Sequence, residues 1–154
     1  MPTKLTEAQG ATEARPSVTD NRAAKIMRMR ELVGYRLRGQ LDELMQSFSV
    51  DSEMYMGGGT QFSSISGRYQ GRAEIREKME SMQDLFTQIT LEVVDLLVEG
   101  DDVAIRWKCK PRNQPAEPKG WLEGMTVVKF RDDLVTYYGN YVDTAALQKL
   151  FEWR

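Results

Sequence analysis

Hydrophobic positions follow a helical period in the first part of the chain. Large apolar residues recur there at steps of three and four, which predicts an amphipathic helix that starts near the capping residue Thr19. Gly39 is expected to break this helix into a long piece and a short one. The predicted apolar stripe consists of Ile26, Met29, Val33, Leu37, Leu41, Leu44 and Phe48. A second stripe, which predicts another helix, consists of Ile75, Met79, Met82 and Phe86.

A two-residue period replaces the helical one in the second half of the chain. Ile89–Glu99 alternates imperfectly, whereas Val103–Lys110 alternates sharply between apolar and polar residues, and both are predicted strands. Trp121–Asp143 contains two runs rich in Val, Tyr, Phe and Thr on either side of Arg131–Asp133. These runs predict a long antiparallel hairpin, because β-branched and aromatic residues suit strands and aspartates tolerate the backbone conformations of a tight turn.

The order of these elements predicts the fold class and the domain boundaries. Glu53–Met56 is a further short strand, and Asp143 is expected to cap a last helix. Helices segregated from an antiparallel sheet define an α+β fold. Met1–Val18 is polar and offers almost no large apolar residue, so we expect residues 1–18 to form a disordered arm. Residues 19–154 are then predicted to form a single domain.

The amino-acid composition limits the partners that the protein is expected to bind and the cellular compartment in which it is expected. The formal net charge of −2 provides no global field that would recruit nucleic acid or an anionic membrane. No apolar run approaches the length that spans a bilayer, and the N-terminus lacks the hydrophobic segment of a signal peptide. Cys109 is the only cysteine, which excludes an internal disulfide and favours a reducing cytoplasm.

The chain contains no histidine. Ser-His and Cys-His catalysis and histidine-containing zinc sites are therefore excluded within it, and we expect neither a metal nor a cofactor. Acid–base work would fall to Asp, Glu, Tyr, Lys, Cys or a bound water. The glycine run at Gly57–Gly59 could suggest a phosphate-binding loop, but no G-K-[ST] follows it, and we interpret it as a flexible loop.

Three stretches, Gly67–Met79, Glu99–Lys108 and Lys129–Asp143, resemble the nuclear transport factor two-like superfamily. That group includes ketosteroid isomerase, scytalone dehydratase, the SnoaL-like polyketide cyclases and limonene epoxide hydrolase. The resemblance covers Ile26 to roughly the C-terminus. It implies a cone-shaped, curved antiparallel sheet wrapped around helices, a cystatin-like half-barrel, with a pocket for a small molecule. The same fold carries many unrelated functions, including non-catalytic ones.

The resemblance to the epoxide hydrolase branch is local and incomplete. That branch uses an Arg-x-Asp pair, a later Asp and a Tyr. Here Arg106 is kept, Lys108 replaces the first aspartate, Asn140 replaces the second, and Tyr55 matches the tyrosine. Because both carboxylates are missing, we expect epoxide hydrolysis to be absent or very weak. The base of ketosteroid isomerase corresponds approximately to Met56, so that mechanism is not expected either.

Successive residues of a strand point to opposite faces of the sheet, and the resemblance implies which of the two sets faces the pocket. This strand parity predicts one concave wall with several polar groups. The catalytic candidates on it are Arg106, Lys108, Tyr138 and Asn140. The ligand-binding candidates are Tyr35, Tyr55, Leu122, Gly124 and Thr126. Two cations beside a phenol and an amide would suit an anionic or enolisable ligand of an isomerase, dehydratase or cyclase. Alternatively, the two cations pair with carboxylates on neighbouring elements, and the chain is a non-catalytic ligand-binding or protein-interaction module of the same fold.

The same parity assigns Trp107, Trp121 and Met125 to the opposite, convex face of the sheet. Large apolar groups on an uncovered sheet face are typical of an interface. We therefore expect a homodimer formed through the sheet, with a small-molecule ligand as the other partner.

Overall fold

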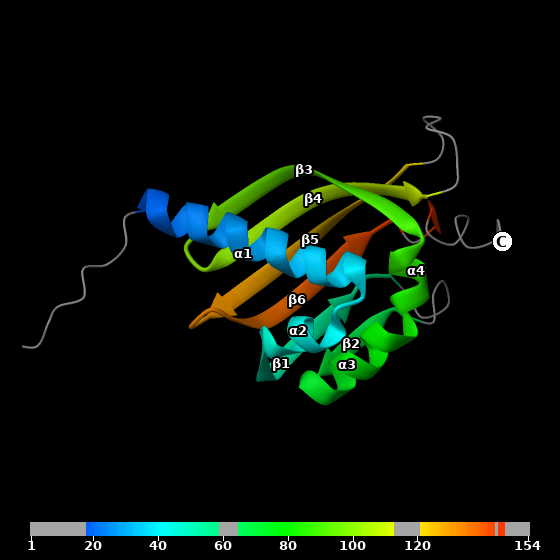
Figure 1. The fold of residues 1–154 in the computed structure, drawn as a ribbon, viewed down its shortest axis with the longest axis horizontal. Coiled ribbons are helices and arrows are strands. Elements are labelled where there is room, and N and C mark those ends of the chain that lie inside the picture. The colour runs from blue at the N-terminus through cyan, green and yellow to red at the C-terminus, as the bar shows by residue number, and fades with distance from the viewer. Residues whose placement is uncertain (1–17, 59–64, 113–120, 144, 147–154) are drawn as a thin grey trace, which may run out of the picture.

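The computed structural model describes residues 18–58, 65–112, 121–143 and 145–146 (Figure 1). Nearly all of the predicted arm and most of the predicted last helix lie outside these residues. The first elements are α1 (Val18–Arg38), α2 (Leu41–Gln46), β1 (Phe48–Met56), β2 (Gly67–Gln70), α3 (Arg72–Ser81) and α4 (Gln83–Thr87). They are followed by β3 (Ile89–Glu99), β4 (Asp102–Pro111), β5 (Leu122–Arg131) and β6 (Leu134–Val142). No helix among the described residues is long and apolar enough to cross a membrane.

The strands form one six-stranded sheet in the order β2-β1-β6-β5-β4-β3. All neighbouring strands are antiparallel except β1 and β6, which run parallel. Helix α1 lies across one face of the curved, open sheet, which we call the inner face, and α3 and α4 lie near its β1–β2 side and the start of β3 (Figure 1). The other side of the sheet is called the outer face. The predicted α+β class with a curved sheet is confirmed, with one parallel pair within it.

The first predicted helix breaks where glycine was expected to break it. Gly39 adopts a φ of 71°, a left-handed conformation that glycine reaches without a steric penalty, and α2 begins two residues later. Phe48 was predicted to end the helical stripe, but it begins β1 instead and is completely buried. Asp143 accepts a hydrogen bond from the backbone N–H of Ala146, as its predicted capping role requires.

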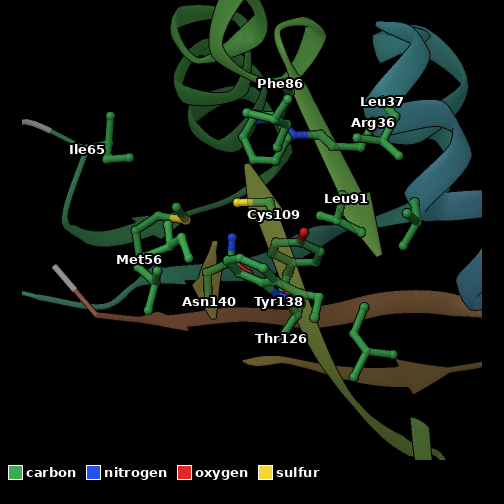
Figure 2. Close-up of a pocket in the computed structure, with 16 residues that line it drawn as sticks. Arg36, Leu37, Met56, Ile65, Phe86, Leu91, Cys109, Thr126, Tyr138 and Asn140 are labelled. Carbon is green, nitrogen blue, oxygen red and sulfur yellow. The ribbon is translucent and has the colours of Figure 1, made fainter. Parts of the chain in front are cut away.

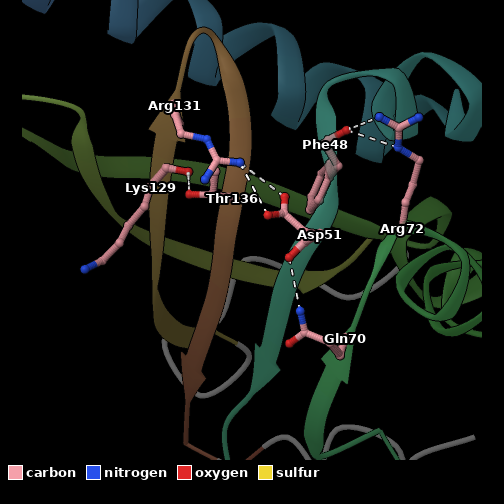
Figure 3. Close-up of polar contacts among 7 residues, drawn as sticks. All are labelled: Phe48, Asp51, Gln70, Arg72, Lys129, Arg131 and Thr136. Carbon is pink, nitrogen blue, oxygen red and sulfur yellow. Dashed lines mark hydrogen bonds and ion pairs between the residues drawn. The ribbon is translucent and has the colours of Figure 1, made fainter.

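The predicted hairpin is formed by β5 and β6. Asp132 and Asp133 have φ values of 50° and 62°, so both central residues of the turn are left-handed, as a tight two-residue hairpin turn requires. Beside this turn, Arg131 donates a hydrogen bond to the carboxylate of Asp51 at the start of β1 (Figure 3). Arg72 of α3 donates to the backbone oxygen of Phe48, where the register between β1 and β6 is shifted (Figure 3). These contacts fasten the irregular start of β1 to the elements on both sides of it.

The register of β4 against β5 corrects the predicted faces of the sheet. Trp107 pairs with Gly124, and Arg106 pairs with Met125. Because paired residues of an antiparallel ladder point to the same face, Trp107 shares the inner face with Gly124 and Thr126. Trp107 is buried there, and Arg106 is on the outer face. The expectation that Arg106 and Lys108 share a wall with Gly124, and that Trp107 faces outward, was wrong.

The Trp107 ring fills the space beside Gly124. A Cβ atom added to Gly124 would lie 2.4 Å from the ring. The indole nitrogen of Trp107 donates a hydrogen bond of 2.9 Å to the hydroxyl of Thr126, two residues further along β5. Glycine at this position therefore permits the ring to lie flat against the sheet, where its N–H is satisfied.

We predict that Gly124→Ala destabilises the protein by about 1–3 kcal/mol, because the added methyl group overpacks the Trp107 ring. Urea unfolding measures this change. In a Trp107→Leu background the same glycine substitution should cost much less, since the clashing ring is gone. An equal loss of stability in both backgrounds would contradict the assignment to this contact.

Candidate functional site

A cavity of about 80 Å³ lies between the helices and the inner face of the sheet (Figure 2). Most of its lining is apolar, and its polar side chains are Arg36, Thr126, Tyr138 and Asn140. The other lining residues are Val33, Leu37, Met56, Ile65, Phe86, Ile89, Leu91, Ile105, Trp107, Cys109, Leu122 and Val142. A largely apolar cavity with a few converging polar groups has the chemical character of a small-molecule site.

A chain of hydrogen bonds across β4, β5 and β6 orients the amide of Asn140. Trp107 donates to the Thr126 hydroxyl, and that hydroxyl donates to Oδ1 of Asn140. This hydrogen bond sets the orientation of the amide and places its NH₂ group on the side away from the Thr126 hydroxyl. Figure 2 shows the Asn140 nitrogen on the cavity side of the strand. Asn140 therefore presents a hydrogen-bond donor to the cavity.

Tyr138 lies two residues before Asn140 on β6 and points to the same face. Its ring packs against Phe48, with the ring centroids 5.9 Å apart, and Figure 2 shows its hydroxyl directed into the cavity. Burial raises the pKa of Tyr138, although the positive charge of Arg36 opposes this shift. The phenol is thus protonated at neutral pH and is a second donor.

Arg36 is the only charged side chain in the described lining of the cavity. It is 6% exposed, and its guanidinium lies 3.9 Å from the centroid of the Phe86 ring. Its Nη1 donates a hydrogen bond of 3.2 Å to the backbone oxygen of Met79, whereas its buried Nη2 has no hydrogen-bond partner. No carboxylate among the described residues forms an ion pair with it. Desolvation lowers the pKa of Arg36 to about 10, so it keeps its charge at neutral pH.

Sequence reasoning missed Arg36, although its position carried a signal. It follows Met29 and Leu32 at steps of three and four, so it continues the side of α1 that is most deeply buried. Burying a cation on a helix face costs free energy, so such a residue is expected either to have an anionic partner or to serve a function. The neighbouring Tyr35, which was predicted to bind ligand, does not line the cavity, and its hydroxyl donates to Glu31 on the same helix.

The remaining sequence candidates divide between the two faces of the sheet. Leu122 and Thr126 line the cavity, as expected, together with Tyr138 and Asn140. Gly124 faces inward but lies beneath the Trp107 ring. Tyr55 is on the outer face, where its ring lies 5.4 Å from that of Tyr141.

Arg106 and Lys108 lie away from the cavity and pair with carboxylates of β3. Arg106 Nε donates a 2.9 Å hydrogen bond to Asp95, and Lys108 forms a 3.2 Å ion pair with Glu92. The Lys108 ammonium also lies 4.5 Å from the centroid of the Trp121 ring. The alternative in which these cations pair with neighbouring elements therefore describes them correctly. Their expected place in the pocket wall was wrong, because the apolar members of β4 take the inner face.

Cys109 contributes a thiol to the cavity wall. Burial raises its pKa to about 11, so the thiol is uncharged at neutral pH and is a weak nucleophile. No aspartate or glutamate lies among the described residues that line this cavity. The site is consequently rich in donors and poor in groups that accept a proton.

Comparisons with known proteins agree with this architecture. No curated protein matches the sequence. TerC, crystallised with polyporic acid, has a TM-score of 0.68 and 18% identity, covering 82% of this chain and 97% of TerC. An NTF2-like protein of unknown function from Burkholderia pseudomallei has a TM-score of 0.67 and 15% identity, covering 81% and 95%. A candidate isomerase from Rhodopseudomonas palustris has a TM-score of 0.65 and 15% identity, covering 84% and 96%.

At these identities the solved structures define a class by fold alone, that of the NTF2-like proteins. The family assignment comes from the sequence itself. The model of the SnoaL-like domain matches residues 13–138, and the chain belongs to that family.

We predict that Arg36→Met leaves the free energy of unfolding unchanged or raises it by up to about 2 kcal/mol, because it removes a buried charge without a carboxylate partner. The lowered pKa of Arg36 means that its cost is fully present below about pH 10 and declines only above that value. The effect should therefore be the same across the neutral pH range, as chemical unfolding at several pH values would measure. Arg106→Met, which removes an exposed ion pair, is the matched control and should change stability by less than about 1 kcal/mol.

Proposed function

We propose that the chain binds a small anionic or enolisable organic molecule in the cavity beneath α1. The observation that carries the proposal is Arg36, a buried cation with an unpartnered Nη2 and no carboxylate among the described residues to neutralise it. A ligand oxyanion would supply both the missing charge and the missing hydrogen bond. Tyr138 and Asn140 are proposed to donate to the same ligand. The crystallisation of TerC, a similar fold, with polyporic acid is consistent with an acidic ligand.

The reaction proposed for this site is isomerisation, dehydration or cyclisation through an enolate. Removing a proton beside a carbonyl group places negative charge on the carbonyl oxygen. Donors that are already oriented in a dry cavity stabilise that charge without reorganising. Arg36, Tyr138 and Asn140 would act in this way as catalytic residues. The described lining offers no carboxylate base, so the proton acceptor would be a bound water or a second group of the ligand itself.

The lack of a carboxylate in the described lining also favours a second candidate, a non-catalytic ligand-binding module. Deuterium exchange separates the two. A catalyst should accelerate exchange at the carbon beside the carbonyl of a bound β-diketone in heavy water, whereas a binding module should not.

We predict that benzoate binds more tightly than its neutral isostere benzamide, and that Arg36→Met weakens benzoate binding by about ten- to a hundredfold. Hydrogen bonds to a charged group contribute about 1.5–3 kcal/mol, which sets this range. Titration calorimetry measures it. Arg106→Met, an exposed arginine on the outer face, should leave the affinity unchanged. Equal affinities for acid and amide, or equal effects of the two substitutions, would refute the proposed role of Arg36.

We further propose a cytoplasmic homodimer formed through the outer face of the sheet. Trp107 cannot contribute, because it is buried on the inner face, and Trp121 lies under two lysine ammonium groups. Met125 and Tyr141, which are paired across β5 and β6, are exposed on the outer face, as is Leu97 of β3. Such an apolar group on an uncovered sheet face supports an interface between two copies.

We predict that sedimentation shows a dimer at micromolar concentration and that Met125→Glu converts it into a monomer, because a buried charge would lie at the centre of the interface. Met27→Glu is the matched control: Met27 is exposed on α1, away from the sheet, and its substitution should preserve the dimer. A wild-type monomer, or a dimer that survives Met125→Glu, would contradict the proposal.

A further inference from the structure

A second hollow, of about 500 Å³, lies between α1 and β3. We call it the α1–β3 groove. Its apolar walls are formed mainly by Ile26, Val33 and Leu37 of α1 and by Val93, Val94 and Leu96 of β3. Arg30 and Asp95 are its charged lining residues. The groove is therefore largely apolar, with a polar element at its edge.

The α1–β3 groove adjoins the cavity that contains Arg36. Val33, Leu37 and Ile105 line both hollows, so these three side chains mark the junction between them. Arg36 directly precedes Leu37 on α1 and lies on the cavity side of this junction. An elongated molecule with its negative charge at Arg36 would have to extend past these three side chains to reach the groove. Ile26 and Leu37 are separated by about 16 Å along α1 at 1.5 Å per residue.

Each wall of the groove has a local irregularity. The register of β3 against β4 shifts between Val93 and Asp95, which leaves Val94 as an extra residue in the strand. Val93 and Val94 are consequently 47% and 42% exposed beside the helix. On the opposite wall Gly34 has no side chain, and the guanidinium of Arg38 lies over it, with Nη1 2.7 Å from the position of an added Cβ atom. The bulge leaves apolar surface of β3 accessible where a more regular strand would cover it.

We propose that the ligand is an amphiphilic organic anion, with its charged head at Arg36 and an apolar tail in the α1–β3 groove. This inference rests on the proposed function, since it takes Arg36 as the site of the head group. The charge of the head follows from the unpartnered, buried guanidinium. The apolar tail follows from a groove with aliphatic walls that adjoins the head-group site.

The test uses the full chain and a series of benzoates with none, a four-carbon or an eight-carbon alkyl group at the para position. Affinity measured by calorimetry, below the concentration at which the acids aggregate, should rise with tail length. About fourfold tighter binding is expected for each methylene that becomes buried. The para-octyl benzamide, which lacks the charge, should bind much more weakly than the para-octyl benzoate.

Two substitutions at Gly34 locate the tail. Gly34→Leu places a side chain in the groove and should abolish the gain from the alkyl group while leaving benzoate binding unchanged. Gly34→Ala is the matched control and should retain most of the gain, and both substitutions favour a helix. Val94→Asn, which makes the other wall polar, is an independent second variant and should also reduce the gain.

The outcomes separate this inference from the proposed function. No binding of benzoate would defeat the proposed function itself. Benzoate binding without any dependence on tail length would overturn only the amphiphile inference, as expected if the groove instead receives a protein segment. A gain from the tail that persists in both Gly34→Leu and Val94→Asn would also overturn it, because the tail would then lie elsewhere.

Discussion

Burying a guanidinium group without a carboxylate costs free energy, and in this fold that cost falls near the C-terminal end of α1. Arg36 offsets part of it by donating to the backbone of Met79 and by lying against the Phe86 ring. These contacts also join the end of α1 to α3 and α4, and the same side chain is the one charged group in the described lining of the cavity. The contact of α1 with α3 and α4 and the charge of the described cavity lining both involve this one residue.

Much of the fold could be predicted because the relevant signals are local. The break at Gly39, the helix that buries Ile75 and Met79, and the two-aspartate turn each depend on residues adjacent in the chain, although the predicted second stripe is divided between α3 and α4. The faces of the strands could not be taken from a remote resemblance. The alternation of Val103–Lys110 already favoured the apolar set as the buried one, and the pairing of Trp107 with Gly124 confirms that local pattern. The bulge at Val94 leaves no comparable signal in the sequence.

The candidate site was only partly predictable for a different reason. Tyr138 and Asn140 were found because they stand together at the end of a recognisable strand. Arg36 was not found because its burial depends on Phe86 and Met79, which are more than forty residues away in the chain and pack on it only in the complete fold. The hydrogen-bond chain from Trp107 to Asn140 likewise joins three strands, so its direction becomes visible only when their register is known.

The parallel pairing of β1 with β6 has a consequence for how the molecule assembles. Met54 lies beside Tyr138, and Met56 beside Asn140, although these partners are far apart in the chain. During synthesis α1, α2 and β1 emerge long before the strand that β1 must join, and a parallel contact of such long range is slow to form. Until β6 is synthesised, β1 can therefore pair only with the short strand β2, and its other edge has no partner strand. Because Met56 of β1 and both donors of β6 line the cavity, the cavity cannot be complete until β6 is in place.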